Sequence, residues 1–152
     1  MNQETDALKL EACRAYARMI NTLDYSCLDP WLNPELEYQS QKVLEVMRGK
    51  ERYSEYIRGK IETIRNSGYL TVAEIAYTDM FDPGPCVIIA QGEEERWVAT
   101  LLLKMKGNRI GSMVMCIIPS PYECRRTREQ PGREQVPVSL RGCLEGIDTK
   151  QL

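Results

Sequence analysis

The chain has 152 residues, a net charge of −2 and 43% hydrophobic residues, which is typical of one soluble globular domain. Its acidic balance argues against a nucleic-acid partner, and no apolar run is long enough to span a bilayer. The first twenty residues lack the charged-then-apolar pattern of a secretory signal. We therefore expect a cytoplasmic protein with neither a nucleic-acid nor a membrane partner.

The chain contains no histidine, and this excludes Ser-His-Asp and Cys-His catalysis. Any general acid or base must be Asp, Glu, Tyr, Lys or Cys. The six cysteines form no C-x-x-C pair, so we expect no metal site, no disulfide framework and no cofactor. Most cysteines are expected to be small buried hydrophobes, with Cys124 and Cys143 the most exposed.

The first half of the chain alternates helices and short strands. Residues 6–23 are predicted as an amphipathic helix, because apolar residues recur at helical spacing. Pro30 suits the first position of a short helical turn carrying Trp31. The stretches 35–41 and 42–49 are typical of a strand hairpin, and residues 50–66 carry the apolar stripe of a second helix.

The second half is predicted as strands at 70–80, 86–92, 96–106 and 109–118, separated by turn signals such as "DPGP". These lengths indicate an antiparallel meander. The whole order is that of an α+β fold with helices on one face of a curved sheet. Residues 119–152 are rich in Pro, Gly and Arg, and are predicted as an extension outside a domain of residues 1–118. Within it, 125–135 is a candidate linker and 136–140 a candidate edge strand.

This order, with the stretch "LNPELEYQS" and the later "VMRGKERYSEYIRGKI", resembles the nuclear transport factor 2-like superfamily, which includes SnoaL-like cyclases and ketosteroid isomerases. The resemblance covers about residues 6–118, and Gly49, Lys50 and Glu51 match its x-G-x-E hallmark. It implies a cone: N-terminal helices pack on a strongly curved, mostly antiparallel sheet and enclose a pocket. The superfamily includes enzymes, ligand binders and dimerisation modules, so the fold does not fix the function.

The resemblance also assigns positions. Tyr16 stands where ketosteroid isomerase-like enzymes carry an oxyanion-stabilising tyrosine, Ser40 stands at their aspartate base, and Thr100 stands at or near their protonated aspartate. A serine with no base beside it has no useful proton affinity near neutral pH, so we do not expect proton transfer of that type. The Asp–Arg–Asp set of limonene epoxide hydrolase-like members is not evident, and the His/Asp arrangement of SnoaL-like cyclases is excluded.

The expected pocket is aromatic with a few hydroxyls, which suits a small apolar ligand. The alternative is that the same side chains are ordinary core residues. The predicted ligand-binding residues are Tyr16, Trp31, Tyr38, Ser40, Tyr56 and Thr100.

No catalytic residue is assigned, and Tyr16 and Glu74 are the only candidates. Glu74 lies in "TVAEIAY", where its neighbours at both parities are apolar. Facing inward, it would be a carboxyl with a raised pKa and an acid/base candidate; facing outward, it would be a solvated strand residue. Glu45 poses the same question.

The strand at 96–106 is apolar at both parities. If Thr100 faces the pocket, the other parity lies outside and needs a cover, because large apolar side chains are costly in water. We expect a homodimer through the outer sheet face, and the competing cover is the tail, through 136–140 and Leu144. The predicted interface residues are Trp97, Leu101, Leu103, Met113 and Met115.

Three hypotheses remain. The first is a small-molecule-binding protein with a mainly apolar, aromatic pocket that lacks the isomerase base. The second is a dimerisation or protein-interaction module with a filled cone. The third is an isomerase- or dehydratase-like enzyme that uses Glu74 as its base.

Overall fold

The computed structural model describes residues 3–133, which form one sheet with two long helices. Short 3-10 turns lie at Tyr25–Cys27, Asp29–Trp31 and Pro121–Glu123. The helices are α1 (Gln3–Thr22) and α2 (Lys50–Ser67), and the strands are β1 (Leu32–Ser40), β2 (Val43–Arg48), β3 (Thr71–Thr78), β4 (Gly84–Gln91), β5 (Trp97–Lys106), β6 (Arg109–Cys116) and β7 (Arg125–Arg126).

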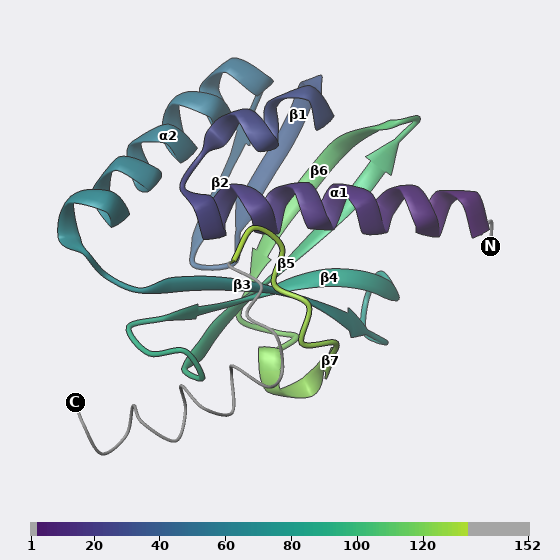
Figure 1. The fold of residues 1–152 in the computed structure, drawn as a ribbon. Helices are drawn as coiled ribbons and strands as arrows, with labels where there is room; N and C mark the ends of the chain where they lie inside the picture. The colour runs from purple at the N-terminus through teal and green to yellow at the C-terminus, as the bar shows by residue number, and fades with distance from the viewer. Residues whose placement is uncertain (1–2, 134–152) are drawn as a thin grey trace, which may run out of the picture.

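The sheet has the strand order β2-β1-β6-β5-β4-β3-β7 (Figure 1). β1 runs parallel to β6, and every other neighbouring pair is antiparallel. The predicted hairpin is β1–β2 and the predicted meander is β3 to β6, so both are confirmed. The strongly curled, mostly antiparallel sheet with its N-terminal helix confirms the α+β class and the cone. Neither α1 nor α2 has the length and apolarity that crossing a membrane requires.

Local sequence explains where α2 begins and ends. Gly49 precedes the helix with φ 99°, a backbone conformation that glycine adopts without a Cβ penalty. Gly68 ends it in the left-handed conformation, and its N–H donates to the Ile64 carbonyl at 3.1 Å, as helix C-termini commonly do. The predicted turn at Pro30 is present as Asp29–Trp31, with proline in its first turn.

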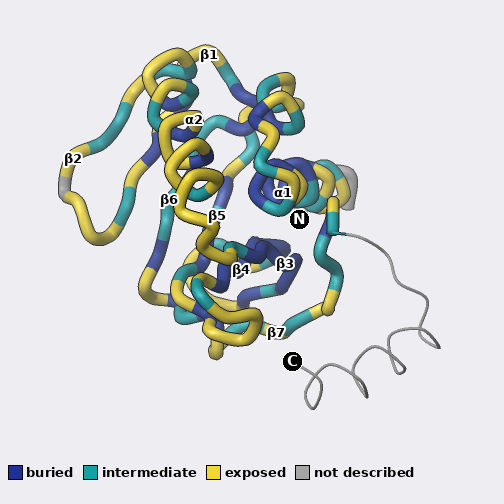
Figure 2. Tube along the Cα trace, turned by 60° about the vertical axis from the view of Figure 1, so that its left-hand side comes forward, coloured by how far each residue is buried: buried dark blue, intermediate teal, exposed yellow. Residues whose placement is uncertain are grey.

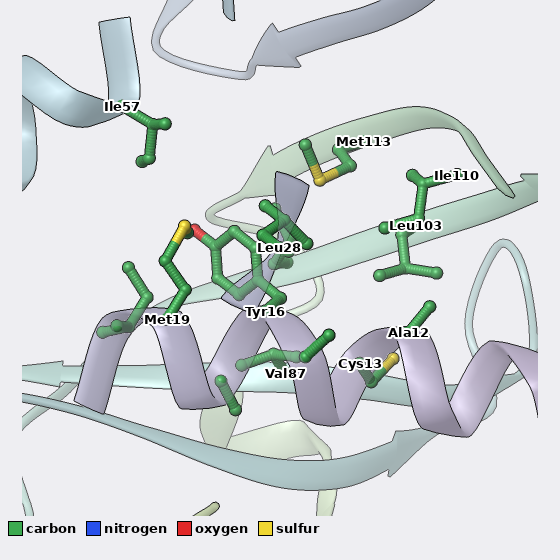
Figure 3. Close-up of a cluster of buried hydrophobic side chains, with 14 of the residues drawn as sticks. Ala12, Cys13, Tyr16, Met19, Leu28, Ile57, Val87, Leu103, Ile110 and Met113 are labelled. Carbon is green, nitrogen blue, oxygen red and sulfur yellow. The ribbon is translucent and has the colours of Figure 1, made fainter. Parts of the chain in front are cut away.

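The inner face of the sheet, toward α1, holds the main hydrophobic core. Figure 3 shows Tyr16 and Met19 projecting from the same side of α1, with Ile57 of α2 facing them. Burial is concentrated in α1, β3 and β4, whereas β2 is largely exposed (Figure 2). Strand residues of this core are Ala73, Ile75, Val87, Leu101, Leu103 and Met113.

The outer face carries a second apolar group, here called the outer-face cluster. The chain covers it with its own residues 119–133: they cross the face, pair with β3 as β7, and then turn back to α1 (Figure 1). Asn21 of α1 donates to the Pro131 carbonyl at 2.7 Å and so holds the end of this segment. The cluster consists of Val72, Ala76, Cys86, Ile88, Ala90 and Trp97.

This segment differs from the linker predicted at 125–135. The described part of it, residues 125–133, is bonded along its length to β3 and α1. Thr127 donates its hydroxyl to the Ile75 carbonyl at 2.6 Å, and Arg14 binds the Glu129 carboxylate at 2.6 Å. The polar composition of residues 125–133 therefore does not indicate a linker. The segment covers the outer face, and charged side chains within it, such as Glu129, have partners in the rest of the chain. The candidate strand at 136–140, Leu144 and Cys143 lie outside the described residues.

The predicted facing of β5 is wrong. Leu101 and Leu103 are fully buried in the inner core, together with Met113 of β6. Met115 packs against that same core, whereas Thr100 lies on the outer face as the register partner of Ile88.

The direction of Thr100 was taken from the resemblance, and a β-bulge explains why Trp97 does not share a face with Leu101. Ile89 pairs with Ala99, but the next residue of β4, Ala90, pairs with Trp97. Val98 is therefore an extra residue on β5, so Trp97 lies on the outer face while Ala99 and Leu101 face inward. Side-chain alternation cannot be counted through such an insertion.

A homodimer stays a prediction, but four of its five predicted interface residues are buried within one chain. Leu101, Leu103 and Met113 are buried within one chain. Trp97 does lie outside, yet it is only 6% exposed, because the Arg126 guanidinium lies over its ring at 4.7 Å from the centroid. Light scattering at micromolar concentration would test the oligomeric state.

Candidate functional site

A cavity of about 460 Å³ lies between the helices and the inner face of the sheet. α1 contributes Tyr16, α2 contributes Tyr56, and β1 contributes Tyr38 and Ser40. These four were predicted from the sequence, and the fold brings them to one cavity. The aliphatic part of the wall consists of Ile20, Ile57, Ile61, Ile64, Ile89 and Met115.

Three tyrosines form a connected aromatic cluster, and two of them, Tyr38 and Tyr56, form the aromatic wall of the cavity. The ring centroid of Tyr38 is 5.2 Å from that of Tyr53 and 5.5 Å from that of Tyr56, and the rings are tilted against each other. Such tilted contacts at this spacing are favourable for aromatic pairs. Tyr53 is completely buried behind the wall and does not line the cavity. The prediction that Tyr53 belongs to the apolar stripe of α2 is confirmed.

Burial raises the pKa of the Tyr16 hydroxyl, and the neighbouring Tyr56 adds to the effect. The pKa of Tyr38 is raised in the same way, first by burial and then by Tyr16 and Tyr56. A tyrosine that holds its proton this firmly is a hydrogen-bond donor at neutral pH and not a base.

Two hydroxyls give the wall a polar component. Ser40 lines the cavity at the end of β1, and its Oγ accepts a hydrogen bond of 3.3 Å from the backbone N–H of Lys42. Thr71 lines it at the start of β3, and its Oγ1 is buried with no hydrogen-bond partner among the described residues. A buried hydroxyl without a partner carries a free-energy cost that a bound polar group can remove.

Two predicted site residues do not line the cavity. Trp31 is half-buried in the turn before β1, where it packs against the edge of the inner core. Thr100 lies on the opposite face of the sheet and is fully buried. Its place in the pocket was expected from the resemblance, whereas in the structure Thr100 is the register partner of Ile88, a residue of the outer-face cluster.

Glu74 also lies on the outer face, and it is fully buried. Its carboxylate accepts hydrogen bonds from Arg126 at 2.8 and 2.9 Å and from Gln130 at 2.9 Å, and a longer one of 3.2 Å from the Arg128 backbone N–H. Burial by itself would raise the pKa of Glu74, but the hydrogen bonds from Arg126 and Gln130 outweigh it and the pKa is lowered. Both alternatives predicted for Glu74 are therefore wrong. It is neither an inward-facing base nor a solvated strand residue. Glu45 is exposed on β2 and lines a smaller hollow beside the main cavity.

Sequence reasoning missed the cations of the cavity. Lys42, Lys60 and Arg96 all line it, and they come from the β1–β2 turn, from α2 and from the turn before β5. Each is exposed, so they lie where the cavity opens to solvent. Nothing in their local sequence marks them, because only the folded chain brings these three elements together.

No protein-family model matches the chain, and no curated protein matches it. Solved structures do match. A SnoaL-like protein of unknown function from Burkholderia thailandensis superposes with a TM-score of 0.56 at 15% identity, over 74% of this chain and 95% of that one. The chain has the SnoaL-like cone fold.

Other structures share this SnoaL-like fold. A domain with a cystatin-like fold from Nostoc punctiforme matches with a TM-score of 0.55 at 10% identity, over 98% of this chain and 88% of that one. An LEH-like epoxide hydrolase from M. tuberculosis matches with a TM-score of 0.50 at 15% identity, over 72% of this chain and 82% of that one. These matches confirm the resemblance seen in the sequence, and identities this low concern the fold alone.

Proposed function

We propose that the protein binds a small, mainly apolar molecule in the cavity between its helices and its sheet. The observation that carries this proposal is the cavity itself: its volume of about 460 Å³ lies within the range of about 300–1,000 Å³ that is common for ligand sites. An interaction module with a filled cone would need no such space. The isoleucine and tyrosine wall supplies apolar contact, and the hydroxyls of Tyr16 and Ser40 supply a few directional hydrogen bonds.

The same lining argues against an isomerase of the ketosteroid type. Among the described residues that line the cavity there is no Asp and no Glu. Tyr16 keeps its proton because burial raises its pKa, and Glu74 lies beyond the sheet in an ion pair with Arg126. A proton-transfer enzyme needs a base within reach of its substrate, so we favour binding without that chemistry.

The proposal is tested by titrating the protein with the neutral apolar dye N-phenyl-1-naphthylamine and following its fluorescence. We expect a saturable rise for the wild type. Ser40→Phe places a ring in the cavity and is expected to weaken binding by about tenfold or more, as the loss of roughly 1.4 kcal/mol would. The matched control is Gln39→Phe, which adds the same ring on the exposed opposite side of β1.

Circular dichroism and thermal unfolding would establish that both variants fold. A saturable signal that Gln39→Phe leaves intact and Ser40→Phe weakens supports the proposal. No saturable signal with folded wild-type protein, or equal binding by the two variants, would reject it.

A further inference from the structure

The charged residues that line the cavity all have the same sign. Lys42, Lys60 and Arg96 contribute three positive charges, and no lining residue is acidic. The whole chain has 22 acidic and 20 basic residues, so an even mixture would be expected by chance. This segregation of charge indicates a ligand with a negative group.

The three cations are not neutralised by the protein. No carboxylate among the described side chains lies within ion-pair distance of Lys42, Lys60 or Arg96. Two acids of the turn before Arg96 have other partners: Glu94 accepts from Arg133 at 2.8 Å, and Glu95 accepts from Arg126 at 2.7 Å.

On α2 the same division holds, because Glu62, two residues after Lys60, pairs with Arg65 at 3.1 Å. Glu62, Glu94 and Glu95 are thus held by arginines that do not line the cavity. The lining cations are left available for an external anion.

Two of the three cations, Lys60 and Arg96, have contacts with residues around the cavity. The Lys60 ammonium lies 5.4 Å from the centroid of the Tyr56 ring, a cation–π contact with a ring of the cavity wall. Arg96 is fixed at its backbone, because its carbonyl accepts a hydrogen bond of 3.1 Å from the Gln91 N–H. Its guanidinium and the Tyr69 ring both approach Gly92, where each would lie 3.4 Å from an added Cβ.

The unpartnered hydroxyl lies at this same end of the cavity. Thr71 is the register partner of Gln91, the residue bonded to Arg96. A ligand oxygen placed here would accept hydrogen bonds from the Thr71 hydroxyl and from the Arg96 guanidinium. Arginine is suited to carboxylates, because its planar fork matches the two carboxylate oxygens.

We propose that the ligand of this cavity is an apolar carboxylate, whose aliphatic or aromatic body packs on the isoleucine and tyrosine wall and whose carboxylate meets Lys42, Lys60 and Arg96 at the opening. This inference rests on the proposed function and adds the chemical class of the ligand to it. Apolar walls next to the opening strengthen the attraction, because charges interact more strongly where the effective dielectric constant is below that of water.

The test compares two ligands that differ only in their head group, decanoate and decan-1-ol, as competitors of bound N-phenyl-1-naphthylamine at pH 7.5. We expect decanoate to displace the dye at a concentration about tenfold lower than decan-1-ol, as charge-assisted hydrogen bonds would give. Raising the salt from about 10 mM to about 300 mM should reduce this preference by screening.

The variant Lys42→Gln/Lys60→Gln/Arg96→Gln should lose the preference for decanoate while it still binds the neutral dye. The matched control is Lys104→Gln/Lys106→Gln/Arg109→Gln, which removes the same charge from exposed positions around the β5–β6 turn, outside the cavity lining. It should keep the preference.

Equal displacement by decanoate and decan-1-ol from wild-type protein that binds the dye would overturn the inference and leave the proposed function standing. Loss of the preference in both triple variants would also overturn it, because the effect would then be one of net charge. Failure of the proposed function looks different, since the wild type would not bind the neutral dye.

Discussion

The two faces of the sheet differ in how their charged groups are paired. On the outer face, the Glu74 carboxylate has four hydrogen bonds, and Arg126 bridges it to Glu95. On the inner face, the Thr71 hydroxyl is buried without a described partner and the lining cations have no described carboxylate. The buried charge of the outer face is therefore paired within the chain, although Thr100 Oγ1 and Trp97 Nε1 on that face also lack a described hydrogen-bond partner, whereas the cations of the cavity are left for a ligand to pair.

The largest effect should come from breaking the ion pair on the outer face. Arg126→Ala leaves the Glu74 carboxylate buried without its cation, and we expect a loss of about 3–5 kcal/mol in the free energy of unfolding. The adjacent Arg125 is the matched control: it is exposed, 3.4 Å from the exposed Asp79, so Arg125→Ala should cost less than about 1 kcal/mol. Urea denaturation measures both losses. Similar losses would contradict the conclusion that Arg126 compensates the buried charge of Glu74.

Adjacent residues of β4 compare the packing of the two faces directly. Ile88 is fully buried in the outer-face cluster, whereas Ile89 lines the cavity. Ile88→Ala should cost about 4 kcal/mol, because it opens a new void in a filled region, and Ile89→Ala about 2 kcal/mol, because its side chain already borders open space. Urea denaturation of the two variants checks the order. The reverse order would show that the inner face is the better filled.

The pH dependence of stability should also reflect the outer face. The pKa of Glu74 is lowered in the folded protein, so its contribution to stability is present above the unfolded carboxyl pKa of about 4.3 and is lost as the pH falls through the lower folded value. The stability difference between wild type and Glu74→Gln should therefore be constant near neutrality and shrink below about pH 4.3. Unfolding measured from pH 7 to pH 3 tests this, and a difference that grows on acidification would contradict it.

The smallest effect concerns reactivity and not stability. The neighbouring Cys86 thiol stabilises the Cys124 thiolate and lowers the pKa of Cys124 to about 7, although burial opposes the shift. Because the thiolate is the nucleophile, alkylation of Cys124 by iodoacetamide should be half-maximal near pH 7. Cys13 is the internal control, since burial raises its pKa to about 12. Mass spectrometry of the labelled peptides reads both, and a midpoint for Cys124 near the usual value of about 8.5 would refute the prediction.

Periodicity predicted the elements well because it reports which residues must be buried. The helix predicted at 6–23 is α1 (Gln3–Thr22), the one predicted at 50–66 is α2 (Lys50–Ser67), and all six main strands were found. Tyr16, Tyr38 and Ser40 reached the cavity because a helix face fixes the direction of Tyr16, and β1 pairs with β6 without a shift from Tyr38 to Ser40.

The errors arose where direction depends on an event that pattern does not record. The resemblance placed Thr100 in the pocket, but Thr100 faces outward and Leu101 inward, and the inserted Val98 puts Trp97 on a different face from Leu101. The partner of Glu74 lies 52 positions away in a segment whose composition resembles a linker. The cations of the cavity opening come from separate turns and a helix, and only the folded sheet brings them to one place.

The position of Arg126 has a consequence for synthesis on the ribosome. The sheet from β1 to β6 is complete by residue 116, but the groups that bind Glu74 come from residues 126–130. Until those residues leave the exit tunnel, a growing chain that has formed its sheet must hold an unpaired carboxylate and the uncovered outer-face cluster. Nascent chains with such exposed apolar surface are the usual clients of chaperones, so this protein should need that protection until its last strand has been added.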